Sequence, residues 1–362
     1  MKTDKGILKR KDRENMTLNE LIVSLCGLPT VSGSERRSTE ALRGLIGAAF
    51  DEMQVDALGN HLFIKRCGRQ DAPKILIDTH LDEIGMMVNG YRDGGFLTVA
   101  NVGGVDTRIL PAGEVVIYGK ETLYGVVAAE PAHLLPAADA EKLKPITEMV
   151  IDTGYSKEEL EQLVPLGTPV GFKPVYGQLA DGRIYGKAFD DKACGACAVF
   201  GIDAVPRNEL AGDVYFLFST FEEIGSMGAR VASFGIRPDY ALVMDVTHAA
   251  TPDAKERSLS PMGSGISIAT AVICDRQLTR MSMELCRAAH IPFVPEAAAG
   301  STGTNANVVN NAAEGIPTVL WSMPIKSMHS AAEILAMEDA KALSQGVREF
   351  VRSRRIAEVF GR

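Results

Sequence analysis

The sequence predicts an α/β protein in which helices flank a mixed sheet and a small β-rich domain is inserted. Short apolar runs rich in strand-forming residues recur along the chain, and each ends in a charged or imidazole side chain. Between about residues 86 and 181, hairpin-like alternation and frequent Gly and Pro replace this pattern. We therefore expect a large domain built from residues 1–84 and 182–362, interrupted by an insert at 85–181.

Length, charge and hydropathy restrict the class of protein. A chain of 362 residues can form one large core and a smaller second one. Its hydrophobic content of 46% and mean hydropathy of +0.04 are ordinary for a globular protein. The net charge of −8 argues against a nucleic-acid partner, which requires clustered Lys and Arg. No apolar run reaches the roughly 18–20 residues of a membrane span, so no membrane partner is expected.

The N-terminal segment and the cysteines indicate the compartment. Residues 1–15 are charged and have no apolar core of a signal peptide, so we expect a solvated tail. Six scattered cysteines without framework spacing predict free thiols in a reducing compartment, the cytoplasm. Cys194 and Cys197 have the spacing of a redox or half-zinc motif, but their neighbours are small and apolar. They are therefore interpreted as buried residues near a helix start.

The first part of the chain leads to a candidate metal ligand. Thr17 and Glu20 form a capping-box pattern that predicts a short helix, and a second helix is expected near 37–50. After a hairpin that ends at 62–65, the apolar strand from Lys74 delivers Asp78, His80 and Asp82 at alternate positions. These three side chains share one face if the extended geometry continues. A metal-binding His needs an acceptor for its second ring nitrogen, and Asp82 is suitably close in sequence; the alternative is a structural His.

The remaining elements supply further polar side chains at their ends. The insert contains two predicted hairpins, over 86–99 and 113–127. In the second part, apolar strands begin near residues 214, 240 and 318, and amphipathic helices are expected at about 276–289 and 338–352. The side chains that follow these strands, or enter the helix after the insert, are Asp190, Glu222, Glu223, Asp245 and His329.

Together with His80, these side chains predict a two-metal site. The ends of strands in an open α/β sheet converge on one crevice, and imidazoles with carboxylates suit zinc, cobalt or manganese. In such a site one carboxylate bridges two ions about 3.5–4 Å apart, and an unligated carboxylate acts as general base for a water between them. The alternative, in which each residue belongs to an ordinary loop, would leave several buried charges uncompensated.

Five motifs in order resemble the M42 metallo-aminopeptidases, of the glutamyl aminopeptidase and tetrahedral aminopeptidase type. They are THLDEIGMMV (79–88), GKAFDDKACG (186–195), FEEIGSMGA (221–229), MDVTHA (244–249) and KSMHSAAEI (326–334). The segments EPAHLL (130–135) and VIDTGYS (150–156) are similar to the PDZ-like β domain inserted in that family. The resemblance thus implies a zinc-peptidase-like catalytic domain with an insert that mediates oligomerisation.

The resemblance also implies roles for single residues. One of two divalent ions would be bound by His80, Asp190 and Asp245, and the other by Asp190, Glu223 and His329. Glu222 would be the general base that activates the metal-bridging water, and Asp82 would orient His80. Members of the family remove N-terminal residues from short peptides in the cytoplasm. They commonly assemble as homo-oligomers, among them hollow tetrahedral dodecamers.

Two departures from the family pattern concern specificity. The family usually has Thr-Asp-Ala where this chain has Thr304-Asn305-Ala306, and Arg-Tyr where it has Lys326-Ser327. Asn305 and Lys326 are therefore candidates for shaping the substrate pocket. Two other functions stay open: a two-metal deacylase of small N-acylated compounds, and a non-catalytic assembly protein, against which the intact ligand set argues. Some relatives carry a cellulase label, but a glycosidase uses two carboxylates and no metal pair.

Overall fold

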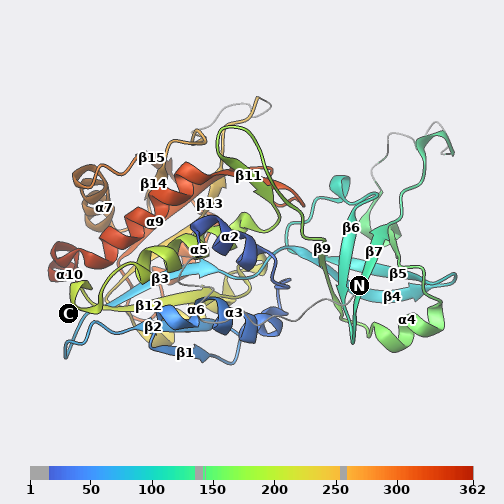
Figure 1. Ribbon diagram of the computed structural model, residues 1–362, viewed down its shortest axis with the longest axis horizontal. Helices are drawn as coiled ribbons and strands as arrows, with labels where there is room; N and C mark the ends of the chain where they lie inside the picture. The colour runs from blue at the N-terminus through green and yellow to red at the C-terminus, as the bar shows by residue number, and fades with distance from the viewer. Residues whose placement is uncertain (1–15, 135–141, 143, 253–258, 362) are drawn as a thin grey trace.

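The computed structural model describes residues 16–134, 142, 144–252 and 259–361, and the predicted tail at 1–15 lies outside these residues. A large α/β body and a smaller β-barrel lie side by side, and the barrel is inserted into the chain of the larger body (Figure 1). The predicted α/β fold with a mixed sheet and a β-rich insert is therefore confirmed. Within the described ranges, no helix combines the length and apolar character that crossing a membrane would require.

An eleven-stranded mixed sheet forms the centre of the larger body. Its main path, in spatial order, is β1 (Glu52–Val55), β2 (His61–Lys65), β12 (Asp213–Ser219), β3 (Lys74–His80), β13 (Tyr240–His248), β16 (Thr318–Lys326), β17 (Glu333–Ala336), β11 (Arg183–Gly186) and β10 (Tyr176–Gln178). Strand β14 (Ile266–Ala271) pairs with β16 and with β15 (Phe293–Ala298). The central strands β12, β3, β13 and β16 are parallel, so their carboxyl ends lie at one edge.

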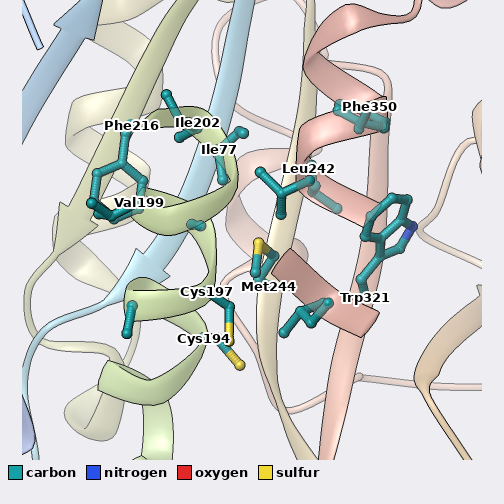
Figure 2. Packing of buried hydrophobic residues seen from close by; sticks show 14 of the residues in the cluster. Ile77, Cys194, Cys197, Val199, Ile202, Phe216, Leu242, Met244, Trp321 and Phe350 are labelled. Carbon is teal, nitrogen blue, oxygen red and sulfur yellow. The ribbon is translucent and has the colours of Figure 1, made fainter. Parts of the chain in front are cut away.

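Helices cover both faces of this sheet. They are α2 (Leu18–Cys26), α3 (Thr39–Ile46), α5 (Phe189–Asp203), α6 (Met227–Ile236), α7 (Arg276–Ala288), α8 (Ala306–Val309), α9 (Met337–Arg352) and α10 (Arg354–Phe360). Helices α2, α5 and α9 cover one face, and Figure 2 shows Trp321 and Leu242 of the sheet packed near Phe350 of α9. Helices α6 and α8 cover the opposite face in a smaller core. Because both faces are buried, the central strands are apolar throughout instead of alternating.

The insert closes into a six-stranded antiparallel barrel with its own core. Its strands in spatial order are β4 (Gly85–Arg92), β5 (Phe96–Val102), β8 (Val150–Asp152), β7 (Thr122–Val127), β6 (Glu114–Tyr118) and β9 (Pro169–Phe172), and α4 (Lys157–Leu163) precedes β9. Strand β10, which follows, pairs with β11 of the large sheet. The division of the chain at 84/85 and 181/182 stays a prediction, and the barrel strands themselves run from Gly85 to Phe172.

Several local predictions can be compared directly with the structure. The capping box of Thr17 and Glu20 starts α2 as predicted, with each side chain bonded to the backbone of the other. The helix expected near 37–50 is instead divided into the 3₁₀ turns η1 (Glu35–Ser38) and η2 (Gly47–Ala49) on either side of α3. Strand β3 ends at His80, so Asp82 lies beyond the strand and does not share its alternation.

Two glycines in helices should respond oppositely to replacement by alanine. A Cβ atom at Gly195 of α5 would lie 2.2 Å from Cε1 of the buried Phe218 ring, whereas one at Gly44 of α3 would meet nothing within 4 Å. We expect Gly195→Ala to lower the free energy of unfolding by about 1–3 kcal/mol through overpacking. Gly44→Ala should raise it by roughly 0.5–1 kcal/mol because alanine loses less backbone entropy. Urea unfolding of both variants measures this, and a stabilised Gly195→Ala protein would contradict the packing described.

Candidate metal centre

The structure brings the predicted ligands together as two groups of three at the carboxyl edge of the parallel strands. The first triad is His80, Asp190 and Asp245, and the second triad is Asp190, Glu223 and His329. Within each triad, one ligand atom from every residue lies within 4.8 Å of the others. The groups come from five separate segments of the chain and share one residue, Asp190.

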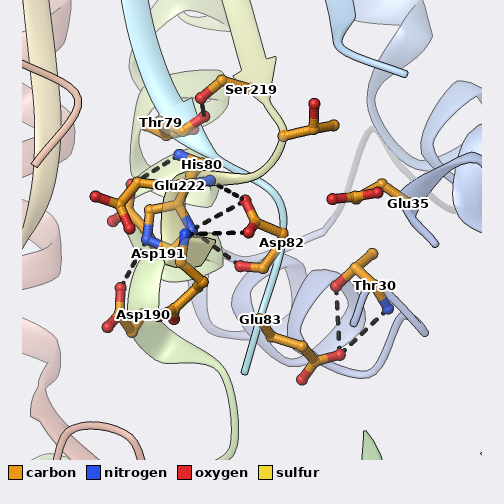
Figure 3. Close-up of polar contacts among 12 residues, drawn as sticks. Thr30, Glu35, Thr79, His80, Asp82, Glu83, Asp190, Asp191, Ser219 and Glu222 are labelled. Carbon is orange, nitrogen blue, oxygen red and sulfur yellow. Dashed lines mark hydrogen bonds and ion pairs between the residues drawn. The ribbon is translucent and has the colours of Figure 1, made fainter. Parts of the chain in front are cut away.

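The first triad is built from neighbouring strand ends. His80 ends β3 and Asp245 lies on the adjacent parallel strand β13, while Asp190 stands at the start of α5. The His80 Nε2 atom lies 2.8 Å from Asp190 Oδ1 and 3.8 Å from Asp245 Oδ1. On the other side of the ring, Nδ1 lies 2.9 Å from the main-chain oxygen of Asp82, to which an Nδ1–H donates (Figure 3). Burial opposes protonation of His80, but the hydrogen bond with Asp190 raises the pKa of the imidazole well above its usual value, and a metal ion would take the place of the proton on Nε2.

The second triad uses the other oxygen of the shared carboxylate. His329 Nε2 lies 3.1 Å from Asp190 Oδ2 and 3.4 Å from Glu223 Oε2. Asp190 therefore faces His80 with one oxygen and His329 with the other, which is the arrangement of a bridging carboxylate. The segment after β5 of the barrel packs closely against this histidine, since a Cβ atom added to Gly104 would lie 2.9 Å from His329 Nδ1.

The carboxylate of Asp82 holds the turn that carries the two glutamates. Its Oδ1 accepts the main-chain N–H of Glu222 at 3.0 Å, and its Oδ2 accepts that of Glu223 at 3.2 Å. Phe221, which precedes them, has a left-handed backbone (φ 59°) that starts the 3₁₀ turn η7 (Glu222–Ile224). The predicted contact of Asp82 with His80 is made at short range by its carbonyl, since its Oδ1 lies 3.7 Å from His80 Nδ1.

Burial and mutual repulsion shift the pKa values of these groups strongly. Burial raises the pKa of Glu223 to about 10, helped by the negative charge of Asp190, and raises that of Glu222 to about 7. Burial likewise raises the pKa of Asp245 well above its usual range. Burial also opposes ionisation of Asp190, but hydrogen bonds with His329 and His80 hold its pKa below the usual value. The site concentrates negative charge that a cation would compensate.

The donor set fits divalent metal ions. Two imidazole nitrogens and three carboxylates, none replaced by a thiolate, suit zinc, cobalt or manganese. The raised pKa values of Glu223 and Asp245 show that the site is costly to ionise without a positive charge. Cys194, the cysteine near the site, is instead buried and donates to the Asp245 carbonyl, and Cys197 is buried in the same helix, as predicted.

The two candidate specificity residues lie at different places. Asn305 is only 1% exposed, and its Nδ2 donates to Ser219 Oγ at 2.8 Å. Ser219 is paired with His80 in the sheet, so Asn305 reaches the residue beside a ligand. Lys326 is half-buried at the end of β16, and among the described residues no hydrogen bond or ion pair joins it to either triad.

Sequence reasoning missed a buried ion-pair network next to the site. Glu83 pairs with Lys187 through Oε2 and with Lys192 at 3.3 Å through Oε1, and all three side chains are buried. Lys192 also donates to Thr30 Oγ1 at 2.6 Å, which ties the 29–35 loop to α5. The available signal was the pair of lysines flanking Asp190 and Asp191, which in sequence resemble ordinary surface residues.

Comparison with known proteins identifies the family. A family model described as M42 glutamyl aminopeptidase matches residues 59–345. The lysyl aminopeptidase of Pyrococcus furiosus is 32% identical over 325 residues, which cover 88% of this chain and 92% of the relative.

Solved structures agree with this assignment. An aminopeptidase from the archaeon Desulfurococcus kamchatkensis has a TM-score of 0.87 at 27% identity, covering 95% of this chain and 97% of its own. The TET1 peptidase of Pyrococcus horikoshii, which can assemble into a tetrahedron or a large octahedral shell, has a TM-score of 0.81 at 28% identity, covering 92% and 99%. Because the family model spans most of the chain and both triads fit metal ions, this protein belongs to the M42 glutamyl aminopeptidase family and is a metallo-aminopeptidase.

Proposed function

We propose that the protein removes N-terminal residues from short peptides, using two divalent ions and Glu222 as general base. The observation that carries this proposal is the sharing of Asp190 by two triads, with Glu222 next in sequence to Glu223 of the second triad and outside both. One ion would be bound by His80, Asp190 and Asp245, and the other by Asp190, Glu223 and His329. When bound, such ions polarise the substrate carbonyl and lower the pKa of the attacking water.

Glu222 is the residue that we assign to proton transfer. It follows Phe221 in a turn whose main-chain N–H groups donate to the Asp82 carboxylate, and these hydrogen bonds hold the backbone of Glu222 in place. Burial raises the pKa of Glu222 to about 7, and positive charge at the triads acts in the opposite direction and favours the ionised, basic form. In this role Glu222 accepts a proton from the attacking water and delivers it to the leaving amine.

The proposal extends to the metal ions, the cellular location and the oligomeric state of the enzyme. We assign zinc as the resident metal, with cobalt or manganese as alternatives that the donor set also accommodates. Six free, buried thiols support a reducing location such as the cytoplasm. A homo-oligomer, with the barrel as the contact domain and a tetrahedral dodecamer as one form, is supported by the assemblies of the P. horikoshii relative.

Metal content tests the shared role of Asp190. Elemental analysis of the dialysed protein should give close to two equivalents per chain. Asp190→Ala should lose both ions because each triad loses a ligand, whereas His329→Ala should retain one. A single tightly bound ion in the unsubstituted protein, or two ions in Asp190→Ala, would refute the two-triad assignment.

Glu222→Gln tests the general base. The amide keeps the size of the side chain but cannot accept the proton, so kcat on an aminoacyl anilide should fall by about 10²–10⁴-fold. Metal content should stay at the unsubstituted level because Glu222 belongs to neither triad. Glu121→Gln, on the exposed surface of the barrel, is a control that should leave kcat unchanged. More than about a tenth of the activity in Glu222→Gln would assign the base to another group.

A structural role for Asn305 competes with the proposal that this residue shapes the substrate pocket. Its neighbour Asp78 is buried, which raises the pKa of that carboxyl to about 6, whereas the nearby polar side chains of Ser219 and Asn305 act in the opposite direction. An aspartate at position 305 would exchange a neutral neighbour of Asp78 for a second carboxylate. The neutral amide thus supports the strand ends beneath the first triad.

Asn305→Asp separates the two roles. If Asn305 acts through packing, the variant should be less stable by about 1–3 kcal/mol at pH 7, because two buried carboxylates lie together. If burial raises the pKa of the two carboxyls in the folded protein, they destabilise it at any pH above their pKa of about 4 in the unfolded chain. The loss of stability should therefore disappear as the pH falls toward 4. The ratio of kcat/KM on free and N-acetylated forms of one substrate should then be unchanged. An altered ratio with unaltered stability would favour direct substrate contact.

A further inference from the structure

Glu333, the first residue of β17, makes contacts that no role assigned so far explains. Its side chain is 2% exposed. It belongs to neither triad. Its Oε2 accepts the main-chain N–H of Asp190 at 3.1 Å, and its Oε1 accepts that of His329 at 2.9 Å. A single buried carboxylate therefore joins the backbones of two metal-ligand residues.

We propose that Glu333 is a positioning residue that sets the affinity of the second triad for its ion relative to the first. This inference rests on the two-ion site of the proposed function. Glu333 joins two ligands of the second triad, which come from the start of α5 and from the β16–β17 hairpin. Without this link, the Asp190–His329 spacing would depend on the conformation of a surface hairpin.

The hairpin needs such a support because its backbone is unusual. Ser327 and His329 have left-handed conformations, with φ of 57° and 60°, which are unfavourable for residues other than Gly. Glu333 is the point at which the chain rejoins the sheet, paired with Gly186 of β11. Because Gly186 lies four residues before Asp190, the same strand pairing brings the hairpin close to the start of α5.

The chemistry of the side chain favours glutamate specifically. Two N–H groups converge on it, so both side-chain oxygens must accept hydrogen bonds. Glutamine has the same shape, but its amide nitrogen is a donor and would oppose one of the two N–H groups. A buried carboxylate beside Asp190 is electrostatically unfavourable, and the two charge-assisted hydrogen bonds from main-chain N–H groups offset this cost.

The first triad has supports of its own. The N–H of His80 donates to Asp191 Oδ2 at 3.2 Å, and its ring is held by the Asp82 carbonyl. The carboxylate of Asp245 accepts the N–H of Val246 at 2.7 Å. Loss of the Glu333 contacts therefore leaves His80 and Asp245 in place. Asp190 keeps its 2.8 Å contact with His80, whereas the backbone of His329 loses its hydrogen bond to Glu333.

The chain offers a matched control in Asp339. This residue is 1% exposed and also uses both carboxylate oxygens, which accept the N–H groups of Gly263 and Gly265 at 2.7 Å each. It stands at the start of α9, and neither of its partners is a metal ligand. Asp339→Asn therefore makes the same chemical change, with a similar expected loss of stability, away from the triads.

The experiment is a titration of the metal-free, full-length protein with Zn²⁺ against a competing chelator, repeated with Co²⁺ and read by its visible absorption. The unsubstituted protein should show two binding steps. In Glu333→Gln one of the two steps, which we assign to the second triad, should lose about 10–100-fold in affinity, as for other residues that orient ligands, while the other step changes by less than about threefold. Asp339→Asn should lower the thermal midpoint and leave the ratio of the two steps unchanged.

Each outcome decides between separate claims. Fewer than two steps in the unsubstituted protein would overturn the two-ion function itself. Two normal steps there, with an unchanged ratio or an equal loss at both steps in Glu333→Gln, would overturn the role of Glu333 alone. Glu333→Asp serves as the second variant if Glu333→Gln does not fold. Aspartate keeps the charge but is one methylene shorter, so it should selectively weaken the step assigned to the second triad. Affinities at both steps equal to those of the unsubstituted protein would overturn the proposal.

Discussion

The organisation of this protein depends on gathering several carboxylates at one buried point. Asp190 stands at the centre, with one oxygen toward His80 and the other toward His329. Around it, the negatively charged side chains are restrained largely through the backbone: Asp82 accepts the N–H groups of Glu222 and Glu223, and Glu333 accepts those of Asp190 and His329. Main-chain donors fix these groups without neutralising them, so the charge stays available to cations.

Much of this arrangement could be predicted from the sequence because the relevant strands are parallel and buried. An apolar run covered on both faces is easily recognised, and its first polar residue then marks the functional edge. This reasoning identified His80 and Asp245, which lie on strands, and the glutamates that follow β12. Asp190 and His329 come from a helix start and a hairpin, and the same reasoning grouped them with the others because each follows an apolar run. The roles of these residues stay predictions, whereas their proximity is observed.

Other features depend on contacts between distant segments and could not be predicted. The strand β3 ends at His80, and the Asp82 carboxylate accepts hydrogen bonds from the Glu222–Glu223 turn, which the alternation of the strand did not indicate, while its Oδ1 stays 3.7 Å from His80 Nδ1. The helix expected near 37–50 is divided by 3₁₀ turns, although its composition indicated one continuous helix. Asn305 looks like a loop residue in sequence, yet it is buried against Ser219. In each case tertiary packing overrode the local pattern.

The buried network of Glu83, Lys187 and Lys192 constrains how such a sequence can diverge. Replacing Glu83 alone would leave two ammonium groups without their acidic partner in an interior that excludes water. Replacing one lysine would leave the glutamate half-compensated beside Asp82. Because a protein in which only one of the three residues is replaced is less stable, changes at these three positions are expected to occur together. Descendants are expected to keep all three or to have lost all three.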